Sequence, residues 1–285
     1  MRRYGIGEWY GEHFLTMVPG RRHTLASYAL GKDKPPPPCP FKRSSSPCSK
    51  KGGVCTLQEY EVSDDRMGNA VGLPVIVCPN RFDEHDLIPR WLGEIAGFED
   101  VYVAREVPFM RAPITGREAG RIDIVLADSS TASDWYGLEI QAVYFSGDNM
   151  IIDFEELLIH ADTAPPKPGK RRPDWRSSSA KRLMPQLEVK APTLRRWGKK
   201  LAVSVDLPFF MAIGGPSEQP SHDINEGDIL WLVPQIDPER GLIKHHWEVL
   251  SLEASSHKLL SATPVKREEF ETDLRSKLAR LDNRP

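Results

Sequence analysis

The sequence lacks any apolar run close to eighteen residues, the length at which a membrane-spanning helix becomes a candidate. Its first residues include a basic pair but no apolar core and no cleavage site of a signal peptide. It also has no internal repeat and no glycine-rich phosphate loop. We therefore expect a cytoplasmic protein without a membrane partner, whose 285 residues suffice for one large or two modest domains.

Cysteine is scarce, and its distribution is uneven. All four cysteines fall in one segment of about forty residues rich in Pro, Gly and Ser, at Cys39, Cys48, Cys55 and Cys78. A cytoplasmic location argues against two disulfides. Four thiolates carried on such loops suit a tetrahedral site for zinc or iron, and the spacing does not choose between them. The alternative is four unrelated cysteines.

Net charge is also low, at −2, but it conceals an asymmetry. The segment from Lys167 to Lys200 contains twelve Lys or Arg and two acidic residues, so its net charge is +10. Its first half mixes the cations with Pro, Ser and Trp175, which predicts a loop. Hydroxyl and guanidinium groups bind phosphates and base edges, so we predict DNA contacts at Arg171, Arg172, Arg176, Ser177, Ser178, Lys181 and Arg182. A linker, or a surface for RNA or a protein, is the alternative.

One stretch combines strand pattern with chemistry. Residues 122–126 and 136–145 are predicted strands joined by a polar turn at 128–133. Side chains two apart share a strand face, so Glu139 and Gln141 project together, and the hairpin brings Asp123 beside them. Two carboxylates and an amide oxygen suit Mg²⁺. The alternative is a pair of solvated strand edges, although the opposite face of the second strand is apolar.

Other segments complete the expected fold. Helical periodicity marks residues 81–98, 151–160 and 265–281, and apolar runs predict strands at 101–109, 229–234 and 245–252. Residues 209–215 are apolar and predict a buried strand or turn.

The active-site residues, with their Glu-x-Gln ending, resemble the PD-(D/E)xK nuclease core in a variant with Gln in place of Lys. Cys-Pro-Phe (39–41), Gly-Val-Cys (53–55) and Val-Cys-Pro-Asn-Arg (77–81) stand in the order seen in NotI-type restriction endonucleases. The resemblance implies an α/β fold with a mixed central sheet flanked by helices and a small loop-rich four-cysteine metal domain. The expected division is residues 1–80 for the cysteine region and 81–285 for the endonuclease.

The resemblance also implies a function, that of a type II restriction endonuclease. It implies a homodimer that hydrolyses duplex DNA with Mg²⁺, held by Asp123 and Glu139 with the main-chain carbonyl of Ile140. Gln141 positions water, and Lys190 is a second candidate cation for charge stabilisation. The four cysteines would hold a structural iron, with zinc as the other option. The competing interpretation is a non-catalytic, metal-stabilised DNA-binding protein in which the carboxylates are idle.

Overall fold

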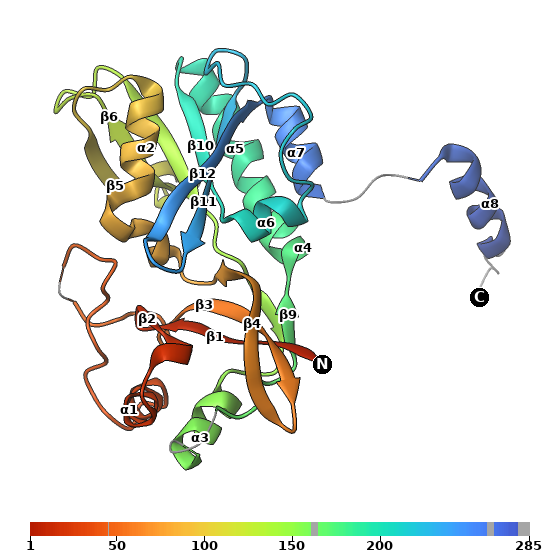
Figure 1. The fold of residues 1–285 in the computed structure, drawn as a ribbon. Helices are drawn as coiled ribbons and strands as arrows, with labels where there is room; N and C mark the ends of the chain where they lie inside the picture. The colour runs from red at the N-terminus through yellow and green to blue at the C-terminus, as the bar shows by residue number, and fades with distance from the viewer. Residues whose placement is uncertain (45, 161–164, 261–264, 279–285) are drawn as a thin grey trace.

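The structure is a computed structural model, and it describes residues 1–44, 46–160, 165–260 and 265–278. Its main features are two β-sheets, one of six strands and one of four, drawn in the upper and lower halves of Figure 1. A short third sheet pairs β8 (Phe145–Gly147) with β9 (Arg171–Pro173). The chain passes from the four-stranded sheet into the six-stranded one and later returns to the first.

The six-stranded sheet is mixed, as the sequence predicts. Its order is β12-β11-β10-β7-β6-β5, and β10 runs parallel to both of its neighbours while the other pairs are antiparallel. The strands are β5 (Tyr102–Arg111), β6 (Glu118–Ala127), β7 (Trp135–Ile140), β10 (Lys200–Ser204), β11 (Ile229–Asp237) and β12 (Gly241–Leu250). The three central strands β7, β10 and β11 are almost wholly buried, which explains their continuous apolar character.

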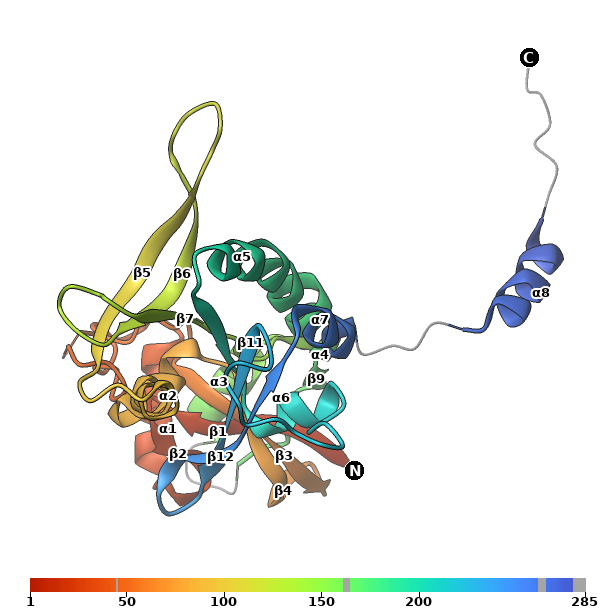
Figure 2. The same ribbon diagram turned by 90° about the horizontal axis from the view of Figure 1, so that it is seen from above.

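Helices cover both faces of this sheet (Figure 2). On one face α2 (Leu87–Ala96) packs Ile88, Trp91 and Leu92 against the sheet. The other face is covered by α5 (Met184–Arg196), α6 (Leu207–Ala212) and α7 (Leu252–Leu260). The helix α2 ends at Gly97, whose φ of 74° suits a residue without a side chain. The mixed sheet flanked by helices is therefore confirmed.

The four-stranded sheet is antiparallel and has the order β2-β1-β3-β4. It contains β1 (Arg2–Trp9), β2 (Glu12–His13), β3 (Val54–Ser63) and β4 (Arg66–Ile76), and α1 (Pro19–Ala29) and α3 (Ile151–Ile159) pack on it. The 3₁₀ helix η1 (Phe14–Thr16) follows β2, and the 3₁₀ helix η2 (Pro79–Asp86) connects β4 to α2. Trp9 is fully buried and stacks on Phe154 of α3 at 5.3 Å. A helix from residues 151–159 thus completes the core of the N-terminal sheet.

Three predicted elements are wrong. The strand expected over 136–145 ends at Ile140. The basic segment, expected to be a loop, is helical from Trp175 onward. Its helices are α4 (Trp175–Ser178), the π-helix η3 (Ser179–Leu183) and then α5. The side chain of Asp174 accepts a hydrogen bond from Ser177 N at 2.9 Å and starts this helix. Residues 207–212 form α6 for the same reason, since Asp206 accepts from Phe209 N at 3.0 Å.

The last described element is α8 (Arg267–Lys277), which buries none of its side chains. Its predicted apolar stripe at Phe270, Leu274 and Leu278 is exposed, and Leu281 lies outside the described residues. Among the described helices none is both long and apolar enough to cross a membrane.

Candidate active site

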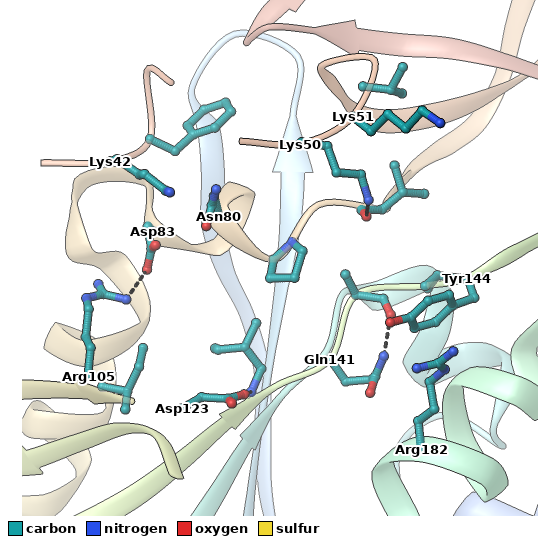
Figure 3. Close-up of a pocket in the computed structure, with 18 of the residues that line it drawn as sticks. Lys42, Lys50, Lys51, Asn80, Asp83, Arg105, Asp123, Gln141, Tyr144 and Arg182 are labelled. Carbon is teal, nitrogen blue, oxygen red and sulfur yellow. Dashed lines mark hydrogen bonds and ion pairs between the residues drawn. The ribbon is translucent and has the colours of Figure 1, made fainter. Parts of the chain in front are cut away.

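A cleft of about 1120 Å³ lies where the two sheets meet. Its floor is formed by the ends of β6 and β7, and its opposite wall by the cysteine-bearing segment and the start of η2. Figure 3 shows Asp123 and Gln141 on the floor, facing Lys42, Lys50 and Lys51 across the opening. The predicted hairpin therefore borders a cavity that can receive a ligand.

Asp123 lies on β6 directly before Ile124, and Ile124 pairs with Leu138 on β7. Its Oδ2 accepts a hydrogen bond from Ile140 N at 2.9 Å, which fixes the carboxylate at the end of β7. Burial raises the pKa of Asp123, and the charge of Glu106 on β5 adds to the rise. The Ile140 hydrogen bond and Lys190 act in the opposite direction.

Glu139 is almost completely buried, with 1% of its surface exposed. Its Oε1 accepts a hydrogen bond from Lys190 Nζ of α5 at 2.6 Å, and the same ammonium donates to Gln186 Oε1 at 3.0 Å. Its Oε2 has no hydrogen-bond partner among the described residues. A buried carboxylate oxygen without a partner is costly, and such an exception calls for an explanation.

The pKa of Glu139 also indicates that the charge of this carboxylate is not fully balanced. Burial, together with the charge of the neighbouring Asp123, raises the pKa of Glu139 to about 7, although Lys190 acts in the opposite direction. Two carboxylates share the charge of one lysine here. Such a pair favours an additional cation, and its perturbed ionisation is typical of functional sites.

Gln141 lies just past the end of β7. Its main-chain N donates to Ser204 O at 3.0 Å, and its Nε2 donates to Ala142 O at 2.5 Å. The side chain is largely buried but lines the cleft (Figure 3). The structure brings Asp123, Glu139 and Gln141 together, but strand alternation does not place Gln141, because the strand has already ended.

The predicted DNA contacts separate into two groups. The Arg171 guanidinium is buried against Asp153, with contacts of 2.7 and 2.8 Å, and Ser178 Oγ donates to Asp174 O while accepting from Tyr144 N. Their polar atoms are already used inside the protein, which removes both from the predicted contacts.

The remaining predicted contacts are more accessible. Arg172, Arg176, Lys181 and Arg182 are exposed, and Ser177 is half-buried. Arg182 lies 3.7 Å above the ring of Tyr144 and lines the cleft.

Sequence reasoning missed the basic residues on the opposite wall of the cleft. Lys42, Lys50 and Lys51 line it, and Lys50 is fixed by donating to Val77 O at 2.7 Å. The signal was present as the pairs Lys42-Arg43 and Lys50-Lys51 between the cysteines. These basic pairs lie between the cysteines, and the sequence alone does not place that segment opposite the hairpin.

The four cysteines gather at one place and form no disulfide. Cys39, Cys55 and Cys78 are buried, Cys48 is partly exposed, and Cys78 N donates to Cys55 O at 3.2 Å. Burial raises the pKa of Cys48, Cys55 and Cys78, and the charges of neighbouring cysteines add to each rise. Within the described ranges, however, no three His, Cys, Asp or Glu side chains are arranged to hold a metal ion. The predicted four-cysteine metal domain is thus not confirmed.

Fold and site together define a mixed α/β protein with a basic cleft, in which Asp123 lines the floor and Glu139 is buried next to it. Residues 31–246 match the sequence model of the restriction endonuclease NotI family. The chain belongs to the NotI restriction endonuclease family. No curated protein matches the sequence. Membership in this family assigns the chain to the restriction endonucleases, which act on DNA.

Proposed function

We propose that this chain is a type II restriction endonuclease that hydrolyses phosphodiester bonds of duplex DNA at a specific sequence with Mg²⁺. The observation that carries the proposal is the unpartnered, buried Oε2 of Glu139 close to Asp123, which itself lines the cleft. A saturated pair would be structural, whereas an open oxygen next to a second carboxylate is a vacant ligand position. Family membership supplies the substrate class.

The donor set fits a hard divalent cation. Asp123 and Glu139 would hold Mg²⁺, with the main-chain carbonyl of Ile140 as a third oxygen. When bound, such an ion lowers the pKa of water and stabilises charge on a phosphate. Among the described residues no three His, Cys, Asp or Glu side chains are grouped to hold a metal, so main-chain and water oxygens would complete the coordination.

Side chains of the protein would balance charge, orient water and bind the DNA backbone. Lys190 balances part of the carboxylate charge from behind, and its hydrogen bond sets the orientation of Glu139. The Gln141 amide nitrogen is committed to Ala142 O, which leaves its Oε1 as the acceptor that orients water. Because Gln141 is neutral, it cannot supply the positive charge of a lysine. Lys42 and Lys51 on one wall and Arg182 on the other hold the sugar-phosphate backbone.

Two further parts of the proposal concern assembly and the cysteines. A homodimer would place two such clefts on a symmetric DNA site.

Cys39, Cys48, Cys55 and Cys78 would hold one structural iron or zinc. Elemental analysis of protein purified without chelator should find about one such ion per chain, and Cys78→Ser should lose it together with several kcal/mol of local stability. Protein that is folded and contains neither metal would contradict this part.

The test of the central proposal is digestion of genomic DNA of known sequence with and without Mg²⁺. Discrete fragments should form only with the ion, and their ends define the recognised sequence. Asp123→Asn should abolish the fragments while DNA binding persists, because it removes a ligand charge and keeps the shape of the side chain. Asp134→Asn is the matched control, since Asp134 lies in the same hairpin, paired with Lys199. DNA binding without any cleavage by the wild type would favour the non-catalytic interpretation.

A further inference from the structure

The β5–β6 hairpin extends well beyond the sheet to which it belongs (Figure 2). β6 pairs with β7 only over residues 124–127, whereas its pairing with β5 continues from Ala127 to Glu118. The outer half of the hairpin is therefore a two-stranded ribbon without a third strand. Hydrogen bonds from Ala112 N to Arg117 O and from Gly116 N to Ala112 O, each of 2.8 Å, close its tip.

Aromatic contacts hold the base of this ribbon. Phe109 of β5 meets Trp197 edge-on at 5.7 Å, just past the end of α5, and Trp197 in turn meets Trp135 at 6.3 Å. Lys199 lies 5.8 Å from the Trp135 ring and forms an ion pair with Asp134 at 2.6 Å. Such ring contacts contribute beyond simple burial. The ribbon therefore has a defined direction relative to the six-stranded sheet.

The outer half of the ribbon is exposed and basic. Residues 107–122 carry three arginines and a single glutamate, a net charge of +2. Arg121 is paired with Glu118 at 2.7 Å, but Arg111 and Arg117 at the tip form no ion pair with a described residue. Ile114 between them is 96% exposed. Two unpaired guanidinium groups thus flank the most exposed apolar side chain of the tip.

The same strand joins this tip to the cleft. Glu118, the first residue of β6 after the tip, is five residues from Asp123, a distance of about 16 Å at the usual rise per strand residue. A ribbon of two strands fits the major groove of B-DNA, which is about 12 Å wide, and not the minor groove of about 6 Å. The ribbon base lines the cleft through Arg105 and Glu106.

We propose that the β5–β6 ribbon enters the major groove of the duplex that lies in the cleft, and that Arg111 and Arg117 contact base edges there. This rests on the proposed function only in taking duplex DNA as the ligand. Charge complementarity selects this occupant over a second copy of the chain, because the tip presents unpaired arginines. Arginine can donate two hydrogen bonds to a guanine edge, so these two positions would contribute to the recognised sequence.

The experiment compares binding, in metal-free buffer, to two duplexes of identical sequence. In one of them every cytosine carries a glucosylated hydroxymethyl group, which fills the major groove and leaves the phosphates unchanged. Wild-type affinity should fall at least about tenfold on the blocked duplex, the effect of losing one good base contact. Arg111→Ala/Arg117→Ala should bind the two duplexes equally, and its affinity for the open duplex should drop to the level of the blocked one.

Arg240→Ala is the matched control. Arg240 is also an exposed arginine at a hairpin tip of the same sheet, between β11 and β12, and it should behave like wild type. Equal binding of both duplexes by the wild type, or a groove preference that survives the double substitution, would overturn the proposal. Loss of a dimer by Ile114→Ser in sedimentation, with groove preference intact, would instead assign the ribbon to a second copy and also overturn it. Failure of the proposed nuclease activity appears separately, as absence of cleavage with Mg²⁺.

Discussion

Among the described residues, the three cation–carboxylate pairs with the most deeply buried cations differ in one respect. Arg81 engages both oxygens of Glu8, at 2.7 and 2.9 Å, and also Glu84, at 2.7 Å. Arg171 engages both oxygens of Asp153. In the third pair, Lys190 binds only one oxygen of Glu139 and leaves the other without a partner. The first two pairs are closed, and the third is open.

The closed pairs connect segments that are distant in the sequence. Arg81, just after Cys78, ties η2 to β1 through Glu8, and Glu84 in turn accepts a hydrogen bond from Leu242 N of β12. Arg171 similarly links β9 to α3 and donates to Tyr4 O of β1. Every strong acceptor in them is used, which is the requirement for a structural buried pair. The open pair lies next to Asp123, which lines the cleft.

Removing Arg81 should have the largest effect on stability. Arg81→Met keeps much of the side-chain volume but leaves Glu8 buried without a partner, and the expected loss in free energy of unfolding is about 3–5 kcal/mol. Arg81→Lys keeps the charge but not the two-pronged contact and should lose less. Urea unfolding of both variants measures the difference. A loss below about 1 kcal/mol for Arg81→Met would show that the pair is not structural.

Arg171→Met should follow, with a loss of about 3 kcal/mol. The loss is smaller because Asp153 still accepts a hydrogen bond from Gly169 N at 3.1 Å. Arg172→Ala, next to it on the exposed side, should leave stability unchanged and weaken DNA binding with a smaller salt dependence. If Arg171→Met is as stable as wild type but binds DNA weakly, Arg171 belongs with the DNA contacts after all.

Lys190→Met should cost less than either arginine substitution, about 1–2 kcal/mol, in metal-free buffer at neutral pH. Glu139 already has a pKa raised to about 7, and losing Lys190 raises it further, so the carboxyl can become neutral by taking up a proton. A raised pKa favours folding at low pH, and this contribution is lost as the pH rises through it. The gap between variant and wild type should therefore widen above pH 7. A gap that is constant from pH 5 to 9 would contradict an ionised pair.

The sequence predicts the central sheet well because its buried strands are distinctive. The run at 229–234 falls within β11, and the run at 245–252 lies in β12 as far as Leu250. The apolar and β-branched side chains of these runs favour strands. The prediction fails at 175–187 and 209–212, where composition suggested a loop and a buried strand or turn, and capping by Asp174 and Asp206 produced helices. A cap is a single hydrogen bond, and a window of composition does not detect it.

The part of the candidate site that lies on strands β6 and β7 was predictable from the sequence. Asp123 and Glu139 follow from a hairpin register, which local pattern determines. The burial of Arg171 depends on Asp153 and Tyr4, and Tyr4 comes from the opposite end of the chain. The basic wall of the cleft depends on how the cysteine segment folds over the sheet. These features arise from contacts between segments far apart in the sequence, which no local pattern carries.

The smallest effect on stability is expected at Glu139 itself, together with the largest loss of activity. In Glu139→Gln the amide oxygen still accepts the Lys190 hydrogen bond, and repulsion from Asp123 disappears, so stability should change by about 1 kcal/mol or less. Mg²⁺-dependent cleavage should fall at least about 100-fold, because a ligand charge is lost.

Measuring the cleavage rate and the unfolding free energy of Glu139→Gln on one preparation tests the central claim most directly. A stable protein that no longer cleaves DNA is the predicted result. A variant that cleaves at the wild-type rate, or one that loses as much stability as Arg81→Met, would show that the open pair is another structural contact and that the chemistry lies elsewhere.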